Sequence, residues 1–173
     1  MGPPGSAGVA EPAGPAESAG AGAARAAAGR GPGVRLGVDV GTVRVGVAVS
    51  DPGGVLASPL VTLARDVAAG SDLDQLAELV RERSVVEVVV GLPRSLSGRA
   101  GPAERAAREY AAALGSRIAP VPVQLVDERL TTVSASRTLT DRGISSRRQR
   151  RIVDQAAAVL ILQGWLEAAR TVR

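Results

Sequence analysis

From Val34 onward, the chain alternates apolar runs with turn-forming residues in a way that predicts β-strands first. Runs rich in β-branched residues cover positions 34–40 and 44–50. Because Gly41-Thr42-Val43 separates them, we expect a hairpin. The turn-forming residues at 51–54 then predict a third strand over about 55–62. This part of the chain therefore predicts a meander of antiparallel strands.

After the meander, helical and strand patterns alternate. Ser71 is the expected N-cap of a helix whose acids lie in the first turn, and its apolar face carries Leu73, Leu76, Ala77 and Val80. The valines at 85–90, interrupted only by Glu87, are typical of a buried parallel strand. Further along, the pattern predicts a helix over 102–116, a strand over 121–126, a helix from 131 to about 141 and a last helix over 152–170. This order indicates an α/β fold with a mixed sheet and helices on its faces.

Residues 1–32 have a different composition from the rest. They are almost entirely Gly, Ala, Pro, Ser and Glu, with too little apolar surface to offset the entropy of ordering. We therefore expect a disordered tail over 1–32 and one folded domain over 33–173. Neither a secretory signal nor a membrane-spanning helix is expected. The absence of cysteine fits a reducing compartment, so we expect a cytoplasmic protein without membrane partners.

The composition restricts the chemistry available to the chain. Histidine, cysteine and lysine are absent, which excludes a Cys/His zinc site, a thiol nucleophile, an imidazole base and a disulfide framework. All 21 basic residues are arginine and the net charge is +4, so anionic partners are expected, nucleic acid first. A solvated arginine-rich surface explains that charge equally well. Any catalysis must use carboxylates, hydroxyls, arginine or a metal held by oxygen.

Asp39 is the first carboxylate that needs an explanation, because it lies between Val38 and Val40 in an apolar strand. Burying an ionised carboxylate without a partner is costly. Asp39 could therefore be a metal ligand or an acid-base group, with glycines nearby that allow close approach. Alternatively, it could end the strand, where it would face solvent or accept hydrogen bonds from the amides of residues 41–43 and so stabilise the turn.

Glu128 and Asp154 raise the same question. Glu128 follows an apolar strand, where it could serve a site or simply pair with Arg129. Asp154 is expected in the first turn of the last helix, where the helix dipole favours a carboxylate whatever its function. Two strand ends and one helix start could bring all three acids together at one edge of the sheet. Such an oxygen-only site suits a hard divalent cation.

Four motifs resemble the YqgF family of candidate pre-16S rRNA nucleases and Holliday-junction-resolvase-like proteins. They are GVDVGTVRVGVAVSD, VVVGLPRSLSGRAGP, VDERLTT and VDQAAAVLILQGWLE, and the resemblance extends from Val34 to Glu167. It implies an RNase H-like fold with three antiparallel strands beside two parallel ones. It also implies that Asp39, Glu128 and Asp154 are the catalytic and metal-binding acids. Asp127 is the weaker candidate, because adjacent strand residues face opposite ways.

The resemblance further implies hydrolysis of phosphodiester bonds with one or two Mg²⁺ or Mn²⁺ ions. The expected substrate is structured RNA, in maturation of the 5′ end of pre-16S rRNA. The alternatives are a four-way DNA junction, whose symmetric cutting needs a dimer, and a nucleic-acid-binding factor that does not cleave. Monomer and homodimer both stay open. An actin-like ATPase is disfavoured, because such enzymes enclose their nucleotide between two domains.

Two further groups of residues are candidates for binding nucleic acid. Gly91, Gly98 and Gly101 could form a phosphate loop before a helix, or an ordinary connection. The candidate arginines are Arg44, Arg94, Arg129, Arg147, Arg148, Arg150 and Arg151. The stretch 129–151 has seven arginines and one aspartate, a net charge of +6, which would attract a phosphate backbone without selecting a sequence.

Overall fold

The computed structural model describes residues 31–93, 101–127 and 147–171, with the backbone alone for 147–154. Its elements in chain order are β1 (Arg35–Val40), β2 (Arg44–Ser50), β3 (Ala57–Ala64), α2 (Ser71–Glu82), β4 (Glu87–Leu92), α3 (Pro102–Ile118), β5 (Val123–Asp127) and α5 (Arg147–Thr171). None of the helices in these ranges is long and apolar enough to cross a membrane. The predicted helix over 131–141 and most of the predicted tail lie outside the described residues.

The strands form one five-stranded sheet in the order β3-β2-β1-β4-β5. The first three strands in the chain pair antiparallel, whereas β4 pairs parallel with β1 and β5 pairs parallel with β4. The predicted mixed sheet is therefore confirmed. Because β1, β4 and β5 run the same way, their carboxyl ends share one edge of the sheet.

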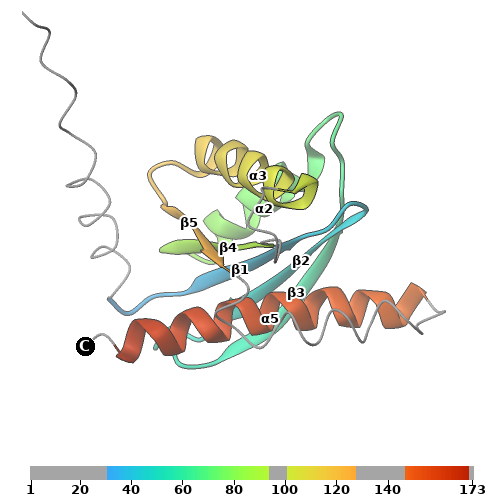
Figure 1. Cartoon of the computed structure of the whole chain (residues 1–173). Coiled ribbons are helices and arrows are strands. Elements are labelled where there is room, and N and C mark those ends of the chain that lie inside the picture. The colour runs from blue at the N-terminus through green and yellow to red at the C-terminus, as the bar shows by residue number, and fades with distance from the viewer. Residues whose placement is uncertain (1–30, 94–100, 128–146, 172–173) are drawn as a thin grey trace, which may run out of the picture.

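Helices cover the two faces of the sheet unequally (Figure 1). Helices α2 and α3 lie on one face, where Leu36 and Val38 of β1 pack with Tyr110 and other buried side chains. The long helix α5 lies alone among the described elements on the other face, where Val89 packs with Leu162. Alternate residues of each strand thus face different helices, which fixes the face to which every strand residue belongs.

The turn after β2 explains why β3 starts later than the pattern predicts. The Asp51 carboxylate accepts hydrogen bonds from the amides of Gly53, Val55 and Leu56 at 2.7 to 2.9 Å. These bonds hold 55 and 56 in the turn, so the strand begins at Ala57 instead of Val55. They also lower the pKa of Asp51, the bond from Leu56 having the largest effect.

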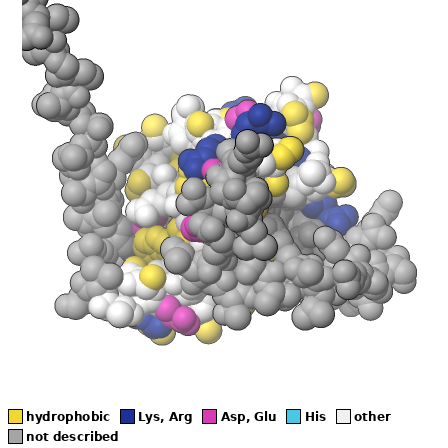
Figure 2. All heavy atoms as spheres, viewed as in Figure 1, with side chains coloured by type: hydrophobic (Ala, Val, Ile, Leu, Met, Phe, Trp, Pro, Cys, Tyr) yellow, Lys and Arg dark blue, Asp and Glu magenta, His cyan; other side chains and the backbone are white. Residues whose placement is uncertain are grey.

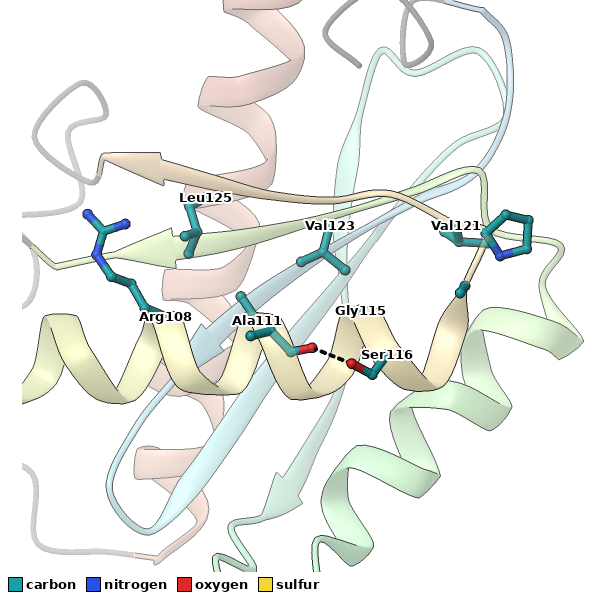
Figure 3. A pocket seen from close by; sticks show the side chains of 10 residues that line it. Arg108, Ala111, Gly115, Ser116, Val121, Val123 and Leu125 are labelled. Atoms are coloured by element: carbon teal, nitrogen blue, oxygen red, sulfur yellow. Dashed lines mark hydrogen bonds between the residues drawn. The ribbon is translucent and has the colours of Figure 1, made fainter. Parts of the chain in front are cut away.

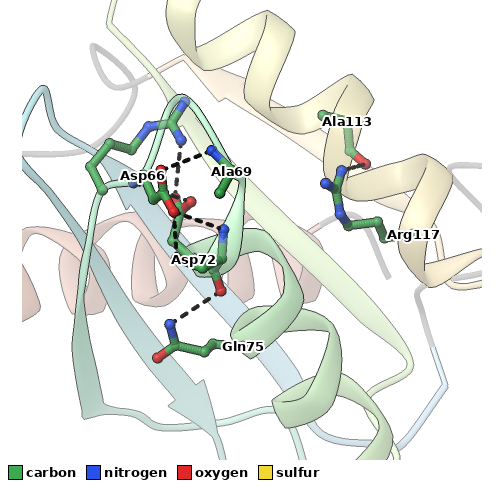
Figure 4. A network of polar contacts seen from close by, with 8 residues as sticks. Asp66, Ala69, Asp72, Gln75, Ala113 and Arg117 are labelled. Carbon is green, nitrogen blue, oxygen red and sulfur yellow. Dashed lines mark hydrogen bonds and ion pairs between the residues drawn. The ribbon is translucent and has the colours of Figure 1, made fainter.

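The start of α2 differs from the prediction. Its N-cap is Gly70, in a left-handed conformation with φ 72°, while Ser71 is the first helical residue and its hydroxyl donates to Asp66. The predicted apolar face is confirmed, but Asp72 is buried as well and binds Arg65 at 3.0 Å. Arg65 also stacks over the ring of Tyr110. Figure 4 shows this polar network at the start of α2, with Arg117 of α3 nearby.

The remaining elements match the predicted types with shifted ends. Strands β4 and β5 each begin two residues later than expected, and α3 continues two residues further. Helix α5 begins at Arg147 rather than Ile152, because the arginines and glutamine before Ile152 are good helix formers that carry no apolar signal. Asp154 therefore does not lie in the first turn, and the helix-dipole explanation for this acid is wrong.

Candidate active site

Asp39 is the fifth residue of β1, and its side chain is only 6% exposed. Its neighbours Leu36 and Val38 belong to the core under α2 and α3, so alternation directs Asp39 to the α5 face together with Gly37. The solvent-facing alternative is therefore wrong. The amide of Gly41 donates to the Arg44 carbonyl at 2.9 Å, so the backbone itself closes the hairpin turn.

Glycines flank Asp39 in both neighbouring strands. Gly46 of β2 pairs directly with it. In β4, Val90 pairs with Val38 in parallel register, so the next residue, Gly91, lies beside Asp39. Neither neighbour contributes a side chain, and a glycine inside a strand often marks a place where a ligand or a second backbone approaches closely. The buried carboxylate thus lies in a part of the sheet surface that has no side chain on either side.

Helix α5 runs antiparallel to β1 across this face. Trp165 lies under the guanidinium of Arg35, at the start of β1, whereas Ala158 and Leu162 lie against Gly37. Leu162 lies at least as close to Gly37 as Ala158 does, so the helix and the strand are compared by direction alone. Moving from this contact toward Asp39 on the strand corresponds to moving from Ala158 toward Asp154 on the helix, so the Asp154 position lies on the Asp39 side of the contact.

The alternation of β5 distinguishes Asp127 from Glu128. Val123 and Leu125 lie toward α3, whereas Gln124 and Val126 belong to the α5 face. By the same alternation, Asp127 is directed away from Asp39, as expected for the weaker candidate. Glu128 lies outside the described residues.

Arg44 is the candidate arginine that the described structure brings to the same place. It begins β2 at the edge where β1 ends, two residues before Gly46, and therefore on the α5 face with Asp39. Gly91 lies within β4, so the expectation that it belongs to a loop is wrong, because the strand extends to Leu92. Gly101 precedes α3 in an extended conformation at this edge. Of the other predicted binding residues, Gly98, Arg94 and Arg129 lie outside the described residues, as do the side chains of Arg147, Arg148, Arg150 and Arg151.

The described donors fit a hard cation but do not form a complete shell. No group of three or more His, Cys, Asp or Glu side chains that could hold a metal occurs among the residues whose side chains are described. Asp39 supplies the type of oxygen that Mg²⁺ and Mn²⁺ prefer, and no histidine or cysteine occurs in the chain to favour zinc. Such a site would require further acids, which the family resemblance implies are Glu128 and Asp154.

Sequence reasoning missed a buried ion pair at the opposite edge of the sheet. Glu87 is fully buried in β4 and binds Arg35 Nε at 3.4 Å, and Gln124 also donates to this carboxylate. Burial raises the pKa of Glu87, and the charge of Arg35 opposes that rise. A charged residue inside a run of valines was the available signal. Because the pair lies at the starts of β1 and β4, far from Asp39 along both strands, its role is structural.

The other face of the sheet offers less for a nucleic acid. A groove of about 480 Å³ lies there between α3 and β5, lined by Leu125, Arg108 and small residues of α3 (Figure 3). Arg108 is paired with Glu104 at 2.9 Å, and Arg117 with Asp74 at 3.0 Å. Figure 2 accordingly shows basic and acidic side chains next to each other in the described part of this view. Arg108 and Arg117 are thus locally neutralised, which reduces what these two arginines would contribute to a cationic surface.

Comparisons with known proteins show the family of this chain. The family model RuvX, described as Holliday junction resolvase, matches residues 33–168. A candidate pre-16S rRNA nuclease of Frankia casuarinae is 63% identical over 137 residues, which cover 79% of this chain and 68% of the relative. One of Mycobacteroides abscessus is 60% identical over 140 residues, covering 81% and 84%.

Solved structures show the fold. RuvC of Thermus thermophilus superposes with a TM-score of 0.52 at 15% identity, covering 80% of this chain and 96% of RuvC. The structure of the same protein in complex with a Holliday junction substrate superposes with a TM-score of 0.51. The fold is therefore RNase H-like, as the motifs implied.

Proposed function

This chain belongs to the RuvX family and is a nuclease, and we propose that it cleaves precursor 16S rRNA in ribosome biogenesis with Asp39, Glu128 and Asp154 as its catalytic acids. The observation that carries the proposal is the position of Asp39. It is a buried carboxylate between two glycines, at the edge where β1, β4 and β5 end. Asp154 supports the proposal through the antiparallel path of α5, and Glu128 through the motif that contains it.

The three acids would hold Mg²⁺ or Mn²⁺. Such a cation would lower the pKa of a bound water molecule and stabilise the negative charge that develops on the leaving oxygen. Asp39 contributes a ligand fixed on a rigid strand, and burial excludes competing water from one side of its carboxylate. Gly46 and Gly91 leave space for a phosphate to approach, and Arg44 at the same edge would contact the phosphate backbone.

The names of the relatives favour ribosomal RNA over DNA as the substrate. A four-way junction is the second candidate, because the family description and the RuvC complex both concern Holliday junctions. The two substrates differ in their requirement for symmetry: cutting both strands of a junction needs two active sites, hence a homodimer. Cleavage of one RNA position can be performed by a monomer. With a ribosomal RNA substrate, the protein would act in the cytoplasm.

A comparison of substrates tests the proposal. The full-length protein is incubated with Mn²⁺ or Mg²⁺ and either an RNA carrying the 16S precursor 5′ leader or a four-way DNA junction, and its mass is measured by light scattering. We expect cleavage of the RNA at a defined position, lost with EDTA and restored by the metal. Preferential cutting of the junction by a dimer would favour the second candidate. Tight RNA binding without cleavage would refute a nuclease and support a binding factor.

A further inference from the structure

Helix α5 contacts β1 more closely at Gly37 than any side chain would allow. A Cβ added at Gly37 would lie 2.6 Å from Leu162 Cβ and 2.8 Å from the carbonyl oxygen of Ala158. Real Cβ atoms essentially never approach other atoms this closely. Neither neighbour can rotate away, because one is a backbone atom and the other is fixed directly to the backbone. Any residue other than glycine would therefore displace the helix or the strand.

The neighbouring strand has a small residue at the same level. Ala48 of β2 pairs with Gly37, is fully buried and packs in the cluster that contains Ala158 and Leu162. The sheet surface that packs against this turn of α5 thus consists of a glycine and an alanine. The separation between helix and sheet at this point is set by the absence of larger side chains.

This contact lies next to both acid positions. Asp39 follows Gly37 by two residues on the strand, and Asp154 precedes Ala158 by one turn on the helix. We propose that Gly37 is a positioning residue of the metal site: it holds α5 at the distance from β1 that the Asp39 and Asp154 positions need to share one cation. The inference rests on the proposed function and adds a residue that contacts neither metal nor RNA.

The expected displacement is large on the scale of metal coordination. Bringing the 2.6 Å separation to an ordinary contact of 3.4 Å requires a shift of about 0.8 Å. Functional groups must be held within about 0.5 Å of their productive geometry, and Mg²⁺ requires near-ideal octahedral ligands. A misplacement of about 1 Å can reduce a reaction rate by about 100-fold. Gly37→Ala should therefore weaken metal binding and cleavage without affecting residues that contact RNA.

The experiment measures Mn²⁺ binding directly, by electron paramagnetic resonance titration of the full-length protein, together with RNA cleavage and RNA affinity in EDTA. We expect Gly37→Ala to weaken Mn²⁺ binding at least about 10-fold and to slow cleavage about 100-fold, with unchanged RNA affinity. Gly115→Ala is the matched control, because its new Cβ would meet only Val123 Cγ2 at an ordinary 3.7 Å. Leu162→Ala controls for lost stability, since it removes packing without pushing the helix outward.

If Gly37→Ala binds Mn²⁺ as tightly as the wild type, the positioning role is overturned. It is also overturned if Leu162→Ala loses as much Mn²⁺ affinity and cleavage rate as Gly37→Ala does. In both cases the proposed function stands. If the wild type neither binds Mn²⁺ nor cleaves RNA, the proposed function itself fails, and this inference with it. Should Gly37→Ala not fold, Ala48→Val decides the question by the same criteria, because it adds bulk beneath the same turn of α5.

Discussion

Replacing Asp72 by asparagine tests how strongly the polar network at the start of α2 holds the fold together. The Asp72 side chain is fully buried and binds Arg65 Nη1 at 3.0 Å, while the amide of Asp66 donates to it at 3.3 Å. The Arg65 side chain is only 13% exposed. Asp72→Asn keeps the shape of the side chain but removes the charge that balances this arginine.

The magnitude follows from the burial of the pair. Breaking a buried ion pair costs about 3 to 5 kcal/mol, because the remaining charge is left without compensation. Arg65 keeps some contact with water and its stacking on Tyr110, and asparagine can still accept the Asp66 amide, which places the expected loss near the lower end. We expect about 3 kcal/mol, or a fall in Tm of about 6 to 12 °C for a domain of this size.

Asp74 provides a matched control on the same helical turn. It also pairs with an arginine at 3.0 Å, Arg117, but its side chain is 69% exposed. Asp74→Asn should therefore cost less than about 1 kcal/mol, although both substitutions remove the same favourable charge from the helix N-terminus. Urea and thermal unfolding followed by circular dichroism measure both variants. Equal losses in the two would refute the argument, because burial would then not govern the energetics of the network.

Three other predictions concern binding, pH and metal. Arg44→Ala should weaken RNA binding and reduce the slope of log K against log salt concentration by about the value of one phosphate contact. Arg81 is exposed and paired with Glu78, so Arg81→Ala should change neither the affinity nor the slope. Filter binding at several salt concentrations measures both variants. The carboxylate of Asp51 accepts hydrogen bonds from backbone amides, which hold its pKa below the usual value of 3.8, so its contribution to stability is present above that pH and is lost as the pH falls. Asp51→Asn should therefore be less stable than the wild type near neutral pH, and its free energy of unfolding in urea should fall less steeply as the pH is lowered. An unchanged pH dependence at acid pH would contradict this. Removing divalent cations with EDTA should abolish cleavage but not RNA binding in a gel-shift assay, and residual cleavage would exclude an obligatory cation.

The sheet was predictable from sequence because the local signals agreed. The hairpin of β1 and β2 has β-branched runs on both sides of a short loop, and the valines of β4 mark a strand buried on both faces. Element ends were less predictable, because they depend on bonds between distant atoms. The bonds from Val55 and Leu56 to Asp51 delay β3, and no pattern of apolar residues encodes them.

The candidate site was predictable only in part. A carboxylate between valines indicated that Asp39 needs an explanation, but its face of the sheet followed from the packing of Leu36 and Val38. That Asp154 lies on the Asp39 side of the contact with Gly37 depends on the antiparallel path of α5, which periodicity cannot supply. Glu87 and Arg35 were missed because their pairing joins two strands that are 52 residues apart in the chain.

The most direct test of the account compares Asp39→Asn with Asp127→Asn. Asp39 faces α5 at the carboxyl edge of the sheet, whereas Asp127 lies at the same edge on the opposite face. With the 16S precursor RNA and saturating Mn²⁺, we expect Asp39→Asn to abolish cleavage while binding RNA nearly as well as the wild type. Asp127→Asn should cleave at close to the wild-type rate. Wild-type cleavage by Asp39→Asn would contradict the proposed active site.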